Sequence, residues 1–279
     1  MQKLRYIICT TCFITIQILA GVDVDNALEQ VNNSIAIDVL GFNLDYKEKF
    51  LPTDIAGLKS TEAGNIIGVV LEIRNIWVER IYTDLYFDYC RGKLKYDGST
   101  QPPRPQPLEF KAEHRFFTAN IKAGPVFTFT DDQVLQLIPY ISVGYRYWYR
   151  HADNIAGNEK YQDYKITGGL RINWLVTEDL ILSPYIAGGK IFNANMKFYG
   201  KNDSSDGFNY KLGNKPTYEG GIELNYRLFD EFFLNSFVTY SQFKYGRSAT
   251  QSDRTYEPDS DTREIKVGLG IRYSWLVNN

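Results

Sequence analysis

The sequence lacks several features that would place it in common protein classes. After the first 21 residues it has no run of about 18 apolar residues, which excludes a helical membrane span there. Of its three cysteines, Cys9 and Cys12 lie in the N-terminal apolar stretch, and only Cys90 lies beyond it. If the N-terminal stretch is removed on export, Cys90 is the one cysteine left, and a single cysteine cannot form an intrachain disulfide. The chain has 31 basic and 33 acidic residues, so no basic excess points to nucleic acid as a partner.

Aromatic residues, by contrast, are abundant. The chain has 21 tyrosines and 17 phenylalanines, yet its mean hydropathy is only −0.32. This combination fits strands in which each apolar residue alternates with a polar one. The composition equally fits a soluble all-β domain, so it does not separate the two.

The N-terminus divides into two predicted segments. Lys3 and Arg5 precede an apolar run from Tyr6 to Ala20, and small residues follow at Ala20 and Gly21. This pattern predicts a secretory signal peptide over residues 1–21. Residues 22–34 are short, polar and acidic, and we interpret them as a periplasmic lead-in to a single domain over residues 35–279.

The last strand-like stretch, Ile265 to Trp275, alternates without interruption. Every odd position is apolar and every even position is small or polar, which predicts a strand with one apolar and one polar face. Its end, Gly270-x-x-Tyr273-x-Trp275, resembles the C-terminal assembly signal of bacterial outer-membrane β-barrels. Four residues follow Trp275, whereas that family usually ends on the final aromatic residue. The resemblance implies export and assembly by the barrel-assembly machinery.

Similar alternation elsewhere predicts about ten strands, and the spacing between them carries the argument for their arrangement. Short gaps at the predicted turns alternate with longer gaps, as in barrels with short periplasmic turns and long extracellular loops. Residues 181–193 and 232–245 alternate poorly, which suggests a β-bulge in each. We therefore predict an antiparallel up-and-down transmembrane β-barrel of ten strands, with eight or twelve as alternatives. The strands are expected near 35–48, 65–76, 79–95, 111–129, 134–151, 161–175, 179–198, 213–228, 231–246 and 263–275.

Alternation also predicts which charged residues point into the lumen. A confined space favours pairing of opposite charges, because burying an unpaired charge costs several kcal/mol. We expect an ion-pair network that plugs a barrel of this size. Its predicted members are Asp45, Glu72, Arg74, Asp84, Asp88, Lys122, Arg146, Lys165, Arg171, Glu219, Glu223, Arg227, Lys266 and Arg272.

The two histidines, His114 and His151, are the main candidates for rim chemistry. Both fall near the loop ends of two adjacent predicted strands, but alternation points His114 inward and His151 outward, which argues against a shared metal site. Ten strands is also the size of the omptin family of outer-membrane proteases, whose sites use an Asp-x-His pair. No Asp-x-His occurs in this chain, so the resemblance in architecture does not bring the omptin activity with it.

These observations predict a non-enzymatic, monomeric barrel in the outer membrane of a Gram-negative bacterium, with no cofactor or metal. Its lumen would be plugged by side chains, and its role would be envelope integrity or loop-mediated binding of a surface ligand. Outer-membrane lipid and lipopolysaccharide are the expected surroundings. Two alternatives stay open: a narrow, porin-like channel for ions or small solutes, and a rim-active hydrolase.

Overall fold

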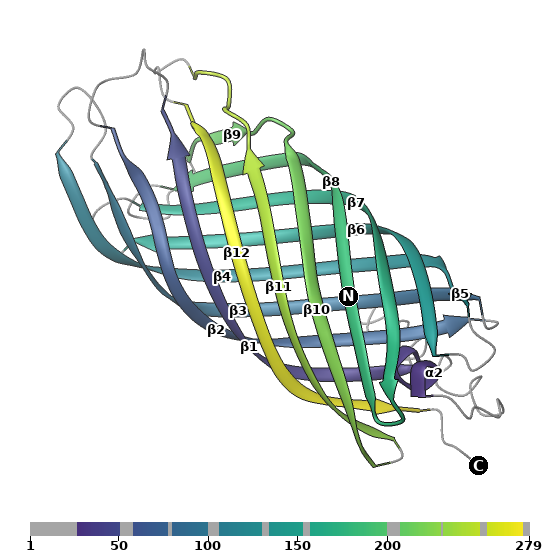
Figure 1. Cartoon of the computed structure of the whole chain (residues 1–279). Helices are drawn as coiled ribbons and strands as arrows, with labels where there is room; N and C mark the ends of the chain where they lie inside the picture. The colour runs from purple at the N-terminus through teal and green to yellow at the C-terminus, as the bar shows by residue number, and fades with distance from the viewer. Residues whose placement is uncertain are drawn as a thin grey trace, which may run out of the picture.

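The computed structural model describes residues 27–50, 58–77, 80–99, 106–129, 134–152, 157–199, 207–229, 231–251 and 256–275. They form a closed antiparallel barrel (Figure 1). The predicted signal peptide lies outside these residues. No helix among them is long and apolar enough to span a membrane. The elements are α2 (Ala27–Asn32), β1 (Ser34–Lys49), β2 (Ser60–Trp77), β3 (Ile81–Ser99), β4 (Pro107–Pro125), β5 (Phe127–Thr128), β6 (Leu135–Ala152), β7 (Gly157–Thr177), β8 (Leu180–Tyr199), β9 (Asn209–Lys211), β10 (Pro216–Phe229), β11 (Phe232–Tyr245) and β12 (Asp259–Ser274).

The barrel closes because its first and last long strands pair along their whole length. β1 pairs with β12 from Ser34↔Ser274 to Lys49↔Asp259. β8 pairs directly with β10, although β9 lies between them in the sequence. The sheet has twelve strands, of which β5 and β9 are short additions beside β6 and β8. The remaining ten form the ring, so the predicted ten-stranded up-and-down barrel is confirmed.

Several strands are longer than the sequence predicted. β2 begins at Ser60, β7 at Gly157 and β12 at Asp259, each about four or five residues before its predicted start. The predicted gap at 152–160 shrinks to residues 153–156, so the strict alternation of short and long connections fails there. The pairing continues into the predicted loops because these segments keep an apolar interior face, described below. We call the end of the barrel that holds the connection between β6 and β7 the loop end, and the end that holds α2 the turn end.

One of the two suspected bulges is present. Between β7 and β8 the register shifts where Gln162 pairs with Asn195 and Tyr164 with Phe192. The extra residue lies on β8, and Asn193 there has a φ of 50°. β11, in contrast, pairs with β12 without a shift over its whole length, so the bulge predicted within 232–245 is wrong. The alternation of β11 is weak because its inward face is itself aromatic, with Phe233, Phe237, Phe243 and Tyr245.

The outer face of the barrel has two zones. Toward the turn end it is an apolar belt, which on β12 runs from Ile265 to Tyr273, about the 9–11 residues that a tilted strand needs to cross a bilayer. Toward the loop end the same face becomes polar, as from Tyr89 to Arg91 on β3 and from Ile265 to Arg263 on β12. Exposed residues of the belt include Ile37, Val39, Ile67, Val69, Leu85, Ile121, Ile141, Val143, Ile166, Trp174, Ile186, Ile222, Leu234, Val238, Val267, Leu269 and Ile271.

The inner face shows the opposite arrangement. Level with the belt it carries most of the buried charges, whereas toward the loop end it is apolar and aromatic. On β1 the inward residues change from Ala36 and Asp38 to Leu40, Phe42, Leu44 and Tyr46, all buried. Beyond the belt the barrel therefore has a polar surface and a largely aromatic interior, as in a water-soluble protein. That interior also holds one cluster of buried charges, described below.

Candidate functional site

The turn end of the lumen is closed by α2. Leu28 and Val31 of this helix are fully buried against Ile181 and Phe233. The Asn32 side chain donates to Gln136 at 2.8 Å and accepts from Asn173 at 3.1 Å. The segment that the sequence suggested as a periplasmic lead-in is thus, from Ala27 onward, a plug packed inside the barrel.

Above α2, five charged side chains from four strands form what we call the arginine–glutamate cluster: Glu72, Arg74, Arg171, Glu223 and Arg272. Glu223 is its centre, because it contacts all three arginines. Glu72 lies 2.7 Å from Arg74 and 2.6 Å from Arg272. Every member is less than a tenth exposed, and the contacts cross the lumen from β10 to β2, β7 and β12.

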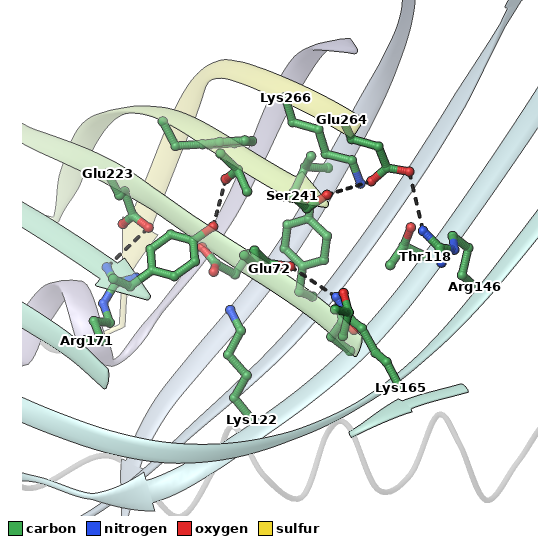
Figure 2. Close-up of a pocket in the computed structure, with 18 of the residues that line it drawn as sticks. Glu72, Thr118, Lys122, Arg146, Lys165, Arg171, Glu223, Ser241, Glu264 and Lys266 are labelled. Carbon is green, nitrogen blue, oxygen red and sulfur yellow. Dashed lines mark hydrogen bonds and ion pairs between the residues drawn. The ribbon is translucent and has the colours of Figure 1, made fainter. Parts of the chain in front are cut away.

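A polar chamber of about 80 Å³ lies beside this cluster (Figure 2), with room for a few water molecules. Ion pairs line or adjoin it: Lys122–Asp84 at 2.9 Å, Lys165–Glu219 at 3.1 Å, Lys266–Asp88 at 2.6 Å and Arg146–Asp163 at 3.0 Å. Arg146 also lies 3.5 Å from Glu264, which accepts from Ser241 at 3.0 Å. The charges of the chamber are thus largely neutralised by partners.

Twelve of the fourteen residues predicted for the lumen network lie in the arginine–glutamate cluster or in these ion pairs. Arg227 is half-buried at the turn end with its guanidinium 5.7 Å from the Phe233 ring centre, and it makes no ion pair among the described residues. Asp45 is a correction: it lies on the outer face, exposed, opposite Arg263. It shares the parity of Ile37 and Val39, which also point outward, and strand alternation forbids it from pointing inward.

The sequence reasoning missed two carboxylates of the chamber. Asp163 and Glu264 have the same parity as Lys165 and Lys266, so the alternation of side chains predicts that both carboxylates point inward. Asp163 is bound by Arg146 and also accepts from the Tyr245 hydroxyl at 2.6 Å.

Toward the loop end the lumen is filled by an aromatic layer, which we define as Phe42, Tyr46, Phe116, Trp148, Tyr161 and Tyr245. Trp148 is its centre and is 1 % exposed. Its ring stacks on Tyr161 with centroids 4.7 Å apart and on Phe116 at 5.3 Å, and it meets Tyr46 edge-on at 5.1 Å. This layer separates the chamber from the loop end.

His114 is buried beside this layer, and its protonation is fixed by its neighbours. Trp148 Nε1 donates to His114 Nδ1 at 2.9 Å, so the neutral ring carries its proton on Nε2, which lies 3.5 Å from a Glu62 oxygen. Burial, reinforced by Arg150, lowers the pKa of His114 to about 3. His151 lies on the outer face and contacts Asn158. The two histidines therefore do not form a shared site.

A second group of charges, the loop-end glutamate cluster, lies around His114 beyond the belt. It consists of Glu48, Glu62, Glu159 and Glu257, with Arg150 as the cation in contact with Glu62 and Glu159. The Tyr161 hydroxyl lies 3.0 Å from a Glu159 oxygen and 2.8 Å from a Glu257 oxygen, and its single proton is donated to one of the two. Burial raises the pKa of Glu48 to about 7, and burial with neighbouring carboxylates raises that of Glu257 well above its usual range.

This cluster predicts a pH dependence. Since the folded-state pKa of Glu48 lies above its unfolded value of 4.5, its contribution to stability is fully present below about pH 4.5 and is lost as the pH rises through about 7. We expect Glu48→Gln, which mimics the protonated carboxyl, to weaken this loss. The measurement is the free energy of unfolding of both proteins between pH 4.5 and 8. Parallel pH profiles for the two proteins would contradict the prediction.

The residues of the C-terminal signature lie where β12 meets β1 and the turn end. Tyr273 is 40 % exposed on the outer face, and the Trp275 backbone amide donates to Asn33 O at 3.3 Å. Gly270 points inward, where a Cβ would overlap the Ile37 carbonyl oxygen and crowd Asp38 Oδ1 at 2.6 Å. Packing against β1 therefore requires glycine at position 270, because only a residue without Cβ allows β1 to approach this closely.

No protein-family model matches the chain, and no curated protein is significantly similar to it in sequence. Among solved structures, the outer-membrane protease OmpT of Escherichia coli superposes with a TM-score of 0.54 at 10 % identity, over 88 % of this chain and 97 % of that one. The chain has the fold of a small outer-membrane β-barrel. The transport unit of the autotransporter AIDA-I of Escherichia coli gives a TM-score of 0.49 at 13 % identity, over 92 % of this chain and 94 % of that one. An outer-membrane location is consistent with this fold and with the apolar belt.

Proposed function

We propose that this outer-membrane barrel is a non-enzymatic, non-conducting protein that acts through its loop end. The observation that carries the proposal is the exchange of polarity along the barrel. Beyond the belt, the strands continue with a polar outer face, and the aromatic layer and the loop-end glutamate cluster fill the interior. Such an extension is a rigid support, which holds the connecting loops away from the membrane. Loops on a rigid scaffold are where binding residues concentrate.

A narrow channel is the main alternative, and the filled lumen argues against it. A conducting path would have to pass the arginine–glutamate cluster, whose members contact one another across the lumen, and then the aromatic layer. The chamber between them holds only a few waters. Small barrels of about eight strands are filled by side chains in the same way, whereas aqueous channels need about sixteen.

The rim-hydrolase alternative is disfavoured by the placement of the histidines. His114 is fully buried, its Nδ1 is occupied by Trp148, and its low pKa keeps the ring neutral. OmpT is a protease, but the Asp-x-His of the omptins does not occur in this chain. We propose instead a monomer that binds a surface ligand or supports envelope integrity, folded into the membrane by the barrel-assembly machinery.

Planar-bilayer conductance of the refolded protein tests the closed lumen. We expect folded, heat-modifiable protein to insert and yet give no steady current, because the arginine–glutamate cluster and the aromatic layer fill the lumen on either side of the chamber in the described part of the barrel. Co-flotation with lipid vesicles verifies insertion in the same preparation. Steady, reproducible channels from wild-type protein would overturn the proposal in favour of a channel.

A further inference from the structure

The outer face carries an open groove over β2, β3 and β4 at the upper edge of the apolar belt. Ala63 pairs with Lys95 and Ile67 with Arg91, but residues 64–66 pair with none of residues 92–94. The strands nevertheless stay close there, because Ile66 points into the barrel and packs over Gly92, where a Cβ would lie 2.4 Å from Ile66 Cγ2 and 3.4 Å from Ile66 Cα. The groove on the outside has a volume of about 550 Å³.

The lower wall of the groove is apolar and faces the position of the bilayer. Ile67 is 75 % exposed, Val69 54 % and Tyr89 44 %. A contiguous band of such exposed apolar residues is typical of the lipid-facing surface of a membrane barrel. The groove therefore opens on lipid.

The upper wall is basic. Arg91 and Lys93 line it with Glu113, and Arg115 lies directly opposite Arg91 in the β3–β4 ladder. Like charges directly opposite each other destabilise a sheet. Glu113 relieves this repulsion, since it lies 2.9 Å from each arginine, but three cations against one carboxylate leave a net positive charge. Lys93 has no ion-pair partner among the described residues.

We propose that this groove binds the phosphate-bearing headgroup of an outer-leaflet lipid. Its phosphate lies between Arg91 and Lys93, and its acyl chains lie along Ile67, Val69 and Tyr89. Two features support a lipid over a soluble anion: the apolar lower wall and the position at the edge of the belt. This inference is independent of whether the lumen conducts.

The test is native mass spectrometry of the folded protein in detergent, titrated with diphosphoryl lipid A or with the same lipid stripped of its phosphates. We expect the diphosphoryl form to bind preferentially. The double variant R91E/K93E should weaken that binding at least 30-fold, since each basic residue near a lipid surface contributes about fivefold. The neutral variant R91Q/K93Q should show a smaller loss, and inorganic phosphate should compete only weakly.

The matched control is K47E/R263E, which changes two exposed basic residues on the polar outer face of β1 and β12. Equal weakening by both double variants would show general charge attraction and overturn the proposal. So would equal binding of the phosphorylated and stripped lipids, or full competition by inorganic phosphate. Heat-modifiable migration establishes that each variant is folded, and conductance of the same preparations tests the closed lumen separately.

Discussion

Replacing Glu223 with alanine is expected to lower the free energy of unfolding by about 3–5 kcal/mol, the usual cost of removing one partner from a buried ion pair. Glu223 contacts Arg74, Arg171 and Arg272. Without it the cluster has three guanidinium groups and one carboxylate, Glu72, in a space closed by α2 below. The three positive charges then repel one another where little water can screen them.

Glu219→Ala on the same strand provides the comparison. Glu219 faces the chamber and pairs with Lys165, and both side chains are 22 % exposed. Water can replace the lost carboxylate there, so we expect a loss of only about 1 kcal/mol. The measurement is a guanidinium titration of the protein in lipid vesicles, followed by tryptophan fluorescence. Equal losses in the two variants would contradict the central role of Glu223.

Replacing Trp148 with alanine is expected to cost about 3–5 kcal/mol, the range for a large buried aromatic side chain. The change removes the stacking on Tyr161 and Phe116 and leaves a cavity in the aromatic layer. It also removes the donor to His114 Nδ1, and a buried acceptor without a donor adds to the cost. The near-ultraviolet circular dichroism of the stacked rings should weaken at the same time.

Tyr149→Ala is the matched control, because the neighbouring residue on β6 points to the outer face. Its ring contacts Arg115 and Lys160 at 5.5 and 5.8 Å, exposed cation–π contacts worth about 0.5–1 kcal/mol each. We expect a loss of stability well below that of Trp148→Ala. If Trp148→Ala were no more costly than Tyr149→Ala, the aromatic layer would not hold the loop end together.

The sequence determined the barrel because alternation of side chains is a local property. On β12 the parity of Ile265 to Tyr273 fixes which face is apolar, and the same rule placed Glu72, Arg171 and Glu223 on the inner face. It failed for Asp45, where parity was not followed. It predicted the strand over 231–246 but not that β11 is regular, because the inward phenylalanines hide the alternation. Where β8 slips past β7 at Asn193, the bulge was suspected but not positioned.

Other features were decided only by the tertiary structure, because they depend on which residues meet across the lumen or between separated strands. Parity gives a direction for Glu223 but not the three arginines, from β2, β7 and β12, that surround it. Neither does it show that α2 enters the barrel, that the strands run beyond the membrane around Trp148, or that Ile67, Val69 and Arg91 border one groove. Strand alternation acts over two residues, whereas these contacts join residues brought together by the closure of the ring.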